Sequence, residues 1–262
     1  MRARSWCYTP LVIIGSLVCS VPVVAGQQPA GDGERPTIQA VRLNSDERVA
    51  VDGRLDEAAW QRAVPISRFT QSDPRNGEPS TESSDIRILF DSDRLYIGAE
   101  LHDSSPEGIL GKQMVRDGTL DADDRFMWVL DPLNDQRSGY FFETNPAGVM
   151  SDAQLIAQNG SNVGTALNRA WDGIWFARVS RHDRGWTVEA EIPFRTMNFN
   201  TDSSVWGVNF QRTIRRKNED TVWTGFRRNQ GLLDLTAAGQ ILGINDIRQG
   251  FGLDLRPYVI GT

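Results

Sequence analysis

Three aspartates stand close together just before an apolar segment, at Asp121, Asp123 and Asp124. Carboxylates at alternate positions of a loop can supply some of the about six to eight oxygen ligands that Ca²⁺ takes. The cluster lacks the glycine and the distal glutamate of an EF-hand loop. The alternative is a charged turn that caps the following strand and pairs with Arg116 and Arg125. We predict the metal-free turn and keep calcium as the second interpretation.

Other residue types that carry chemistry give weaker signals. Glu189 and Glu191 share one face of a predicted strand, and paired acids about 5 to 9 Å apart can hydrolyse glycosidic bonds across a cleft. A solvated strand edge explains these two residues equally well. The two histidines, His102 and His182, are isolated in the sequence, which disfavours zinc and catalytic-triad chemistry. We therefore predict that the protein is not an enzyme.

The composition limits the partners. The chain of 262 residues suits one large β domain, or a domain and the start of another. It has 28 basic and 34 acidic residues, a net charge of −6. Nucleic acid and anionic lipid are both negatively charged, so this balance disfavours them as partners.

The first residues have the pattern of a secretory signal. Arg2 and Arg4 precede an apolar stretch at 11–24, and Ala25 offers a small residue for cleavage. We predict a signal peptide at 1–25 and a polar linker at 26–37. Both cysteines, Cys7 and Cys19, fall in the predicted signal, so the mature protein is expected to lack disulfides. The expected location is the periplasm, the outer membrane or the cell surface.

Short strands separated by turns fill the rest of the chain. Segment 126–130 is apolar on both faces and pairs across a turn-rich connection with 140–144, which predicts a central hairpin buried on both sides. Other strands are expected at 38–43, 85–89, 95–101, 175–179, 186–192, 205–214, 221–226 and 239–244. Segment 155–170 is predicted to be a loop, and 55–60 a single helical turn. The pattern predicts an all-β, antiparallel, jelly-roll-like β-sandwich.

The predicted strand 186–192 alternates in character. Trp186, Val188, Ala190 and Ile192 face one way, whereas Thr187, Glu189 and Glu191 face the other. Such alternation is typical of a strand with one face in water. We therefore expect the two glutamates to be solvated.

Five sequence blocks together resemble a known family. They are VDGRLDEAAW, ILFDSDRLYIGAELHD, DADDRFMWVLDP, GWTVEAEIPF and WGVNFQR, in this order. The set is similar to family 9 carbohydrate-binding modules, and most closely to the module at the N-terminus of bacterial envelope proteins with an uncharacterised β-barrel region. The resemblance covers 38–246, and the segment at 247–262 looks like the start of such a barrel. It implies an exported, non-catalytic domain that binds a poly- or oligosaccharide in carbohydrate catabolism, in a protein associated with the outer membrane.

Under this resemblance, five residues are candidates for the sugar site. Proteins bind sugars by stacking aromatic faces on the rings and by hydrogen-bonding the hydroxyls with planar polar groups. Trp171 and Trp223 lie beside loops, and Arg212, Asn209 and Arg116 lie on or next to strands. The alternative is that the tryptophans belong to the core and the polar residues to structural ion pairs.

The chain departs from the family at its sugar-binding positions. The resemblance places one clamp tryptophan at Asp121-Ala122 and the other near Leu232, where no aromatic residue stands. Met127 takes the place of an acidic hydroxyl-binding residue, and Glu143 that of an arginine. Two hypotheses follow: a sugar-binding module, or a structural or gating domain of an outer-membrane barrel protein that has no sugar site.

Overall fold

The computed structural model describes residues 35–157 and 165–250. The chain divides into two units, 1–33 and 34–262, and all described residues belong to the second. The predicted signal peptide with its two cysteines, most of the predicted linker and the barrel-like residues from 251 onward therefore lie outside the described residues. Within the described residues, no helix has the length and apolar character needed to span a membrane.

Thirteen strands make up most of the described structure. They are β1 (Thr37–Arg42), β2 (Thr70–Asp73), β3 (Ser84–Phe90), β4 (Arg94–His102), β5 (Arg125–Asp131), β6 (Ser138–Thr144), β7 (Met150–Ala157), β8 (Thr165–Asn168), β9 (Phe176–His182), β10 (Gly185–Pro193), β11 (Val205–Ile214), β12 (Glu219–Val222) and β13 (Gly239–Leu242). The helical elements are α1 (Ala58–Arg62) and the 3₁₀ turns η1 (Pro106–Gly108), η2 (Phe194–Thr196), η3 (Arg215–Lys217) and η4 (Leu235–Ala237).

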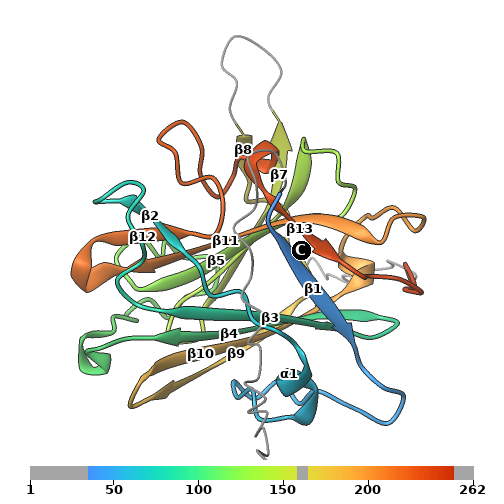
Figure 1. Cartoon of the computed structure of the whole chain (residues 1–262), viewed down its shortest axis with the longest axis horizontal. Coiled ribbons are helices and arrows are strands. Elements are labelled where there is room, and N and C mark those ends of the chain that lie inside the picture. The colour runs from blue at the N-terminus through green and yellow to red at the C-terminus, as the bar shows by residue number, and fades with distance from the viewer. Residues whose placement is uncertain (1–34, 158–164, 251–262) are drawn as a thin grey trace, which may run out of the picture. The chain divides into compact units, whose positions relative to one another are not determined.

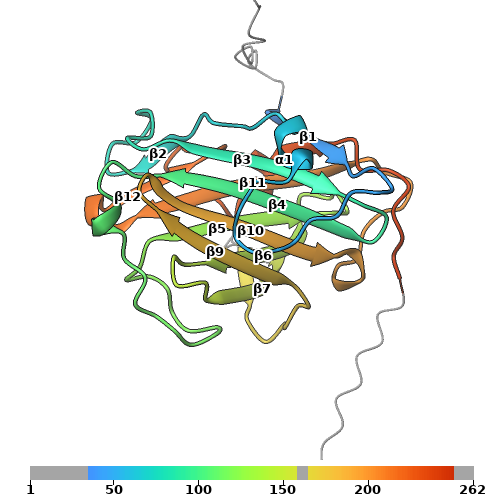
Figure 2. The ribbon, with the colours of Figure 1, turned by 90° about the horizontal axis from the view of Figure 1, so that it is seen from below.

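The strands form one curled sheet in the order β8-β7-β6-β5-β11-β13-β1-β3-β4-β10-β9, and β12 and β2 extend from β11. We call the strands from β8 to β13 half A and those from β3 to β9 half B (Figures 1 and 2). The strand β1 joins the halves. It pairs in parallel with β13 through Thr37–Gln39 and in parallel with β3 through Ala40–Arg42, whereas the other pairs are antiparallel.

The main core lies between the two halves. Because successive side chains of a strand point to opposite faces, Phe126 and Trp128 of β5 point inward, toward Trp186 and Val188 of β10. The Trp128 ring stacks on Phe142 with centroids 5.6 Å apart. These side chains are fully buried, so burial of aromatic surface between the halves supplies much of the driving force for folding.

Each half is also covered on its outer face. On half B, α1 and the preceding loop cover Leu89 and Tyr96 with a small cluster centred on Trp60. On half A, the segment 229–237 covers the outer side chains of β5, β6 and β7, and Leu232 and Leu235 are its buried members. The two covers explain why β5 and β10 are buried on both faces.

The all-β sandwich prediction is confirmed, and the hairpins β3–β4, β5–β6 and β9–β10 lie where the sequence predicts them. The helical turn also forms and carries Trp60 inward, with none of its surface exposed.

One prediction about the elements is wrong: the segment 155–170, predicted to be a loop, contains the end of β7 and all of β8. The short strand β2 and the first part of β7 have no counterpart among the predicted strands. In β7 every second residue, Ser151, Ala153 and Leu155, points outward. This alternation is followed by a glycine- and asparagine-rich stretch, whose composition predicts a loop and hides the strand before it.

The predicted wet face of β10 is also wrong. Glu189 has no exposed surface, because the loop before α1 and the Trp60 side chain lie over it. Alternation within β10 cannot reveal a cover that comes from about 130 residues earlier in the chain.

Candidate functional site

A pocket of about 740 Å³ opens on the outer face of half A, between the sheet and the segment 229–236. Its apolar floor comes from the sheet residues Met127 and Phe141 and from Leu167 of β8. Leu232 and Leu235 close it from the covering segment. In Figure 1 these parts meet near the labels β7 and β8.

Strand register places two polar side chains of the pocket, Gln211 and Glu143, in one row with Met127 and with the neighbouring Ser151. Met127 on β5 lies opposite Gln211 on β11 and opposite Glu143 on β6, which in turn lies opposite Ser151 on β7. Directly paired residues project to the same face, so all four side chains point outward on half A. The row therefore gives a floor with an amide at one end and a carboxylate and a hydroxyl at the other.

Glu143 is the buried acid of this row, with only 3% of its surface exposed. Arg125 pairs with it at 2.9 Å and also with the exposed Asp121 at 2.6 Å. Burial raises the pKa of Glu143, and the Arg125 guanidinium opposes that rise. The pair fixes the positions of a donor and an acceptor group at the side of the pocket.

Arg169 supplies an exposed cation at the same place. Its guanidinium carbon lies 5.8 Å from the centre of the Phe141 ring, and it donates a hydrogen bond of 3.1 Å to the Ser151 hydroxyl. A cation held over an aromatic face is stabilised by the ring's quadrupole. The Phe141 ring and the Ser151 hydroxyl thus hold the guanidinium at the edge of the pocket, where it is exposed to a ligand.

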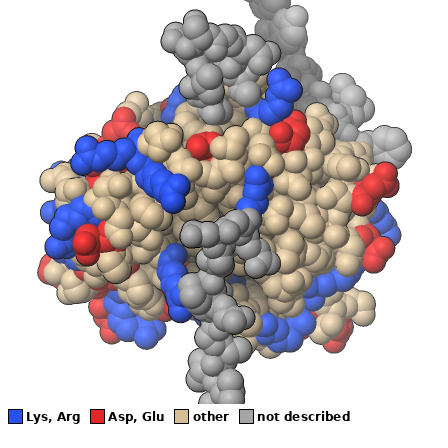
Figure 3. All heavy atoms as spheres, turned by 45° about the horizontal axis from the view of Figure 1, so that its top comes forward, with Lys and Arg blue, Asp and Glu red and all other residues tan. Residues whose placement is uncertain are grey.

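A second pocket of about 240 Å³ adjoins the first. It is lined by residues 117–121 together with Glu143 and Arg169, both of which also line the larger pocket. The two pockets thus meet at this acid and this arginine, and together they extend from the segment 229–236 to the loop before β5. Figure 3 turns the end of the molecule that carries β7 and β8 toward the viewer, and charges of both signs are mixed there with uncharged residues.

These features suit a ligand with apolar faces and many hydrogen-bonding groups. The leucines, Met127 and Phe141 offer contact surface, and Gln211, Glu143 and Arg169 offer planar polar groups around it.

The tryptophans predicted for the site do not line either pocket. Trp171 packs on Tyr140 with ring centroids 5.0 Å apart, and Trp223 packs on Phe210 at 5.9 Å. Both are partly buried at the edge of the main core, and their roles in sugar binding stay predictions.

The polar strand residues Asn209 and Arg212 have no exposed surface. Asn209 binds the backbone N–H and carbonyl of Thr224, each at 3.1 Å. Arg212 donates to the carbonyls of Ser83, at 2.9 Å, and His102, at 2.6 Å, and burial lowers its pKa to about 10. In this structure both side chains join neighbouring segments of the chain.

Arg116 is half-exposed and lies among acids. It pairs with Asp152 at 2.9 Å, with Asp172 at 3.4 Å and with Asp117 at 3.5 Å. It lines neither pocket, although its neighbour Asp117 lines the smaller one.

The three aspartates proposed as calcium ligands have separate partners. Asp123 accepts from the backbone N–H of Lys112 and Gln113, each at 2.9 Å, and from the Asn145 amide at 2.8 Å. Asp124 accepts from the N–H groups of Leu110 and Arg215, and Asp121 faces Arg125. Among the described residues these carboxylates do not converge on one point, so they do not fit a calcium site.

None of the five residues predicted for the sugar site lines this pocket, and Arg169 and Gln211 were not predicted. The positions at which the chain departs from the family, Met127, Glu143 and Leu232, do line it. One signal was available: a strand that is apolar on both faces, as β5 is, needs a cover on each side, and the leucine-rich segment at 232–235 is a suitable cover.

The chain matches the model of the carbohydrate family 9 binding domain-like family over residues 51–230. No curated protein matches the chain.

Solved structures share the fold. A carbohydrate-binding module of family 9 from Caldicellulosiruptor kristjanssonii, in complex with cellotriose, is 15% identical and aligns with a TM-score of 0.54 over 85% of this chain and 100% of that one. The same type of module from that organism in complex with glucose is 14% identical, with a TM-score of 0.51 over 80% of this chain and 96% of that one. A candidate carbohydrate-binding protein from Bacteroides uniformis is 13% identical, with a TM-score of 0.56 over 80% and 98%. At these identities the likeness shows the fold alone.

Proposed function

We propose that this chain, which belongs to the carbohydrate family 9 binding domain-like family, binds a poly- or oligosaccharide without transforming it. The observation that carries the proposal is the pocket on half A. It is lined by Met127, Glu143 and Leu232, three positions at which the family resemblance places sugar contacts. The family's characteristic side chains are absent there, but the cavity and a ring of polar groups remain.

The pocket suggests how a sugar would be held. Aliphatic carbons of Leu232, Leu235 and Met127, with the Phe141 ring, would contact the C–H face of a pyranose ring. Gln211, Glu143 and Arg169 would bind hydroxyl groups at its edge. Contact with aliphatic carbon lacks the stacking contribution of tryptophan, so we expect weaker binding than an aromatic clamp gives.

The junction of the two pockets suggests a ligand longer than one sugar. A ring in the larger pocket would direct its neighbour past Glu143 and Arg169 into the smaller one. We therefore expect affinity to increase from a monosaccharide to a trisaccharide.

The proposal includes a place for this activity. The N-terminal pattern of basic residues followed by an apolar stretch supports export, and the resemblance to envelope proteins supports a location in the periplasm or at the outer membrane, in carbohydrate catabolism.

Calorimetric titration of the chain with glucose, cellotriose and xylotriose, and affinity gels with xylan and cellulose, test the proposal. Arg169→Ala and Gln211→Ala should weaken binding about tenfold, because each removes a polar group that faces the ligand. Arg178→Ala, at an exposed arginine on β9 of half B, is the matched control and should change nothing.

Three results separate the hypotheses. Loss of binding in Arg169→Ala but not in Arg178→Ala supports the pocket. Loss confined to Trp171→Ala or Trp223→Ala would move the site to the tryptophans predicted from the sequence. A folded chain that binds none of these glycans would contradict the proposal and favour a structural or gating domain of a barrel protein.

A further inference from the structure

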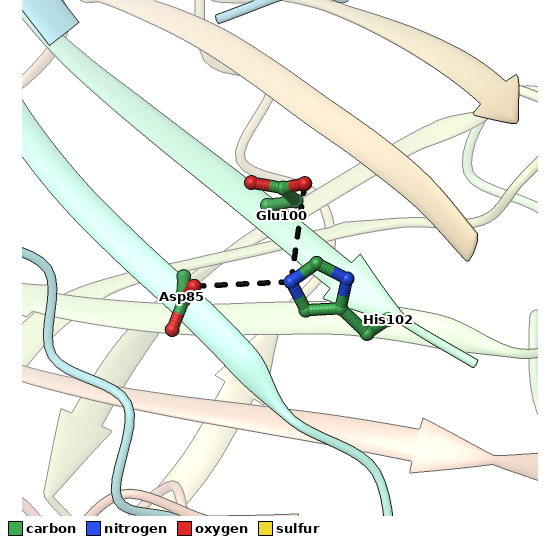
Figure 4. A group of neighbouring side chains, drawn as sticks. All are labelled: Asp85, Glu100 and His102. Atoms are coloured by element: carbon green, nitrogen blue, oxygen red, sulfur yellow. Dashed lines mark ion pairs between the residues drawn. The ribbon is translucent and has the colours of Figure 1, made fainter. Parts of the chain in front are cut away.

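A second group of side chains that could bind a ligand lies on half B, apart from the sugar pocket. Asp85 on β3 lies directly opposite Glu100 on β4, and His102 follows two residues later on the same strand and the same face. Figure 4 shows the imidazole ring directed between the two carboxylates.

The distances in this group match a bridging ion better than direct hydrogen bonds. The Nε2 atom of His102 is 3.8 Å from Oδ2 of Asp85 and 3.8 Å from Oε1 of Glu100. All three atoms lie within 4.8 Å of one another. A hydrogen bond of this type is about 3.2 Å or shorter, whereas two metal–ligand bonds of about 2.1 Å at a wide angle span this separation.

We propose that Asp85, Glu100 and His102 form a site for a divalent transition metal of the Zn²⁺ type. One imidazole nitrogen and two carboxylate oxygens are ligands that Zn²⁺ accepts, and water would complete the coordination. The three side chains are about one-quarter exposed, so an ion can reach them from solvent. Calcium and magnesium prefer oxygen-only ligands and should bind poorly.

The surroundings hold the ligands in position. The Ser67 hydroxyl donates a hydrogen bond to Oδ1 of Asp85, which leaves Oδ2 directed toward the histidine. Such outer partners orient metal ligands in known sites. Arg184 lies 3.6 Å from Oε1 of Glu100 and is the cation that a bound metal would have to displace.

The second histidine of the chain provides a matched control on the same half of the sheet. The Nε2 atom of His182 is 3.2 Å from the Thr187 hydroxyl, and its Nδ1 accepts from the Arg184 N–H at 3.3 Å. Both ring nitrogens thus have partners within the protein. Within the described residues, the only group with metal-ligand spacing is the one around His102.

The test is calorimetric titration of ZnCl₂ into the full chain, without a histidine tag and with Cys7→Ser and Cys19→Ser, because thiols bind zinc themselves. We expect one ion per chain. His102→Ala should weaken binding about tenfold or more, and His182→Ala should change it less than about twofold. Arg184→Ala should strengthen binding, since it removes the competing cation, and excess CaCl₂ or MgCl₂ should not displace the zinc.

Imidazole ¹⁵N spectra identify the ligand directly, and thermal melts show that each variant is folded. Zinc should shift the His102 resonances and leave those of His182 in place. Zinc affinity that is unchanged in folded His102→Ala, or unchanged in both Asp85→Asn and Glu100→Gln, would overturn the proposal. Equal losses in the two histidine variants would overturn it as well. Sugar binding is measured separately, so failure of one proposal leaves the other standing.

Discussion

A segment of the chain covers the outer face of each half of the sheet, but only the cover on half A leaves a pocket. On half B, α1 places the Trp60 side chain directly on the sheet: a Cβ atom added at Gly98 would come within 2.8 Å of the Trp60 ring. On half A, the segment 229–236 brings leucines over the sheet and leaves a pocket of about 740 Å³. A large ring laid on a glycine closes one face, and shorter side chains over Met127 and Glu143 leave the other open.

Each face also contains a buried glutamate, and the two are held in different ways. Glu189 on half B accepts from the backbone N–H groups of Asp52 and Gly53 and from the Trp60 indole. Glu143 on half A is paired with the charged side chain of Arg125. The closed face thus fixes its acid with uncharged donors, whereas the open face keeps a charge pair at the side of a cavity. A similar scaffold gives a structural contact on one side and a candidate binding surface on the other.

The largest expected effect is the loss of stability when the closed face of half B loses its central side chain. Trp60→Ala should lower the free energy of unfolding by about 4 kcal/mol, because it empties the centre of the closed face. Urea denaturation measures the change. Phe176→Ala, at an aromatic residue that is 51% exposed, is the control and should cost less than about 1 kcal/mol. A small loss in Trp60→Ala would show that the cover on half B does not hold the fold.

The charge pair of half A gives the next largest effect. Arg125→Met should destabilise the protein by about 3 kcal/mol at neutral pH, because Glu143 would stay buried without its cation. The double variant Arg125→Met/Glu143→Gln should recover most of that loss in the same denaturation experiment. If the double variant is no more stable than the single one, the unpaired charge of Glu143 is not the cause of the destabilisation.

The acid of half B should make stability depend on pH. Burial raises the pKa of Glu189 from 4.5 to about 7, although three N–H donors oppose the rise. The folded state therefore holds this proton more tightly than the unfolded state. The resulting stabilisation is full below about pH 4.5 and is lost as pH rises through 7, and it amounts to about 3 kcal/mol.

Melting temperatures between pH 5 and 8 check this slope. Glu189→Gln should flatten it, whatever the variant's absolute stability, since the titrating group is gone. The exposed Glu107→Gln should keep the wild-type slope. Identical slopes in wild type and Glu189→Gln would show that the acid of the closed face does not titrate in this range.

The smallest expected effect is on ligand affinity at the open face. Leu232→Trp would place an aromatic face in the pocket and should tighten binding of a glucose trisaccharide by about 1 kcal/mol, roughly fivefold. Val64→Trp, at an exposed position beside α1, adds the same ring elsewhere and should leave affinity unchanged. Weaker binding in a folded Leu232→Trp would mean that the ring fills the space a sugar needs.

The sequence predicts most of the fold because its signals are local. Alternating and apolar strands with turns between them identify the hairpins, and the apolar character of β5 on both faces reveals that both are covered. The strands that were missed are β2, β7 and β8. Strands β2 and β8 have only four residues each, and the alternation of β7 runs directly into the glycine- and asparagine-rich stretch that predicts a loop.

The sites are harder to predict, because their residues meet only in the folded chain. Arg169 and Gln211 line one pocket from distant strands, and Glu189 is covered by a loop far from it in sequence. Arg212 illustrates the converse: a charged residue in an apolar strand suggests a ligand, but its partners are the carbonyls of Ser83 and His102. Polarity indicates that a side chain needs partners, and the fold decides which ones.

The position of β1 has a mechanical consequence. Its first residue, Thr37, and the last residue of its parallel neighbour, Leu242, lie at opposite ends of the pair, so tension between the preceding and following chain pulls the two strands lengthwise past each other. In that direction their hydrogen bonds are loaded together instead of opening one after another. The strand that joins the halves is therefore loaded in shear along its pairing with β13.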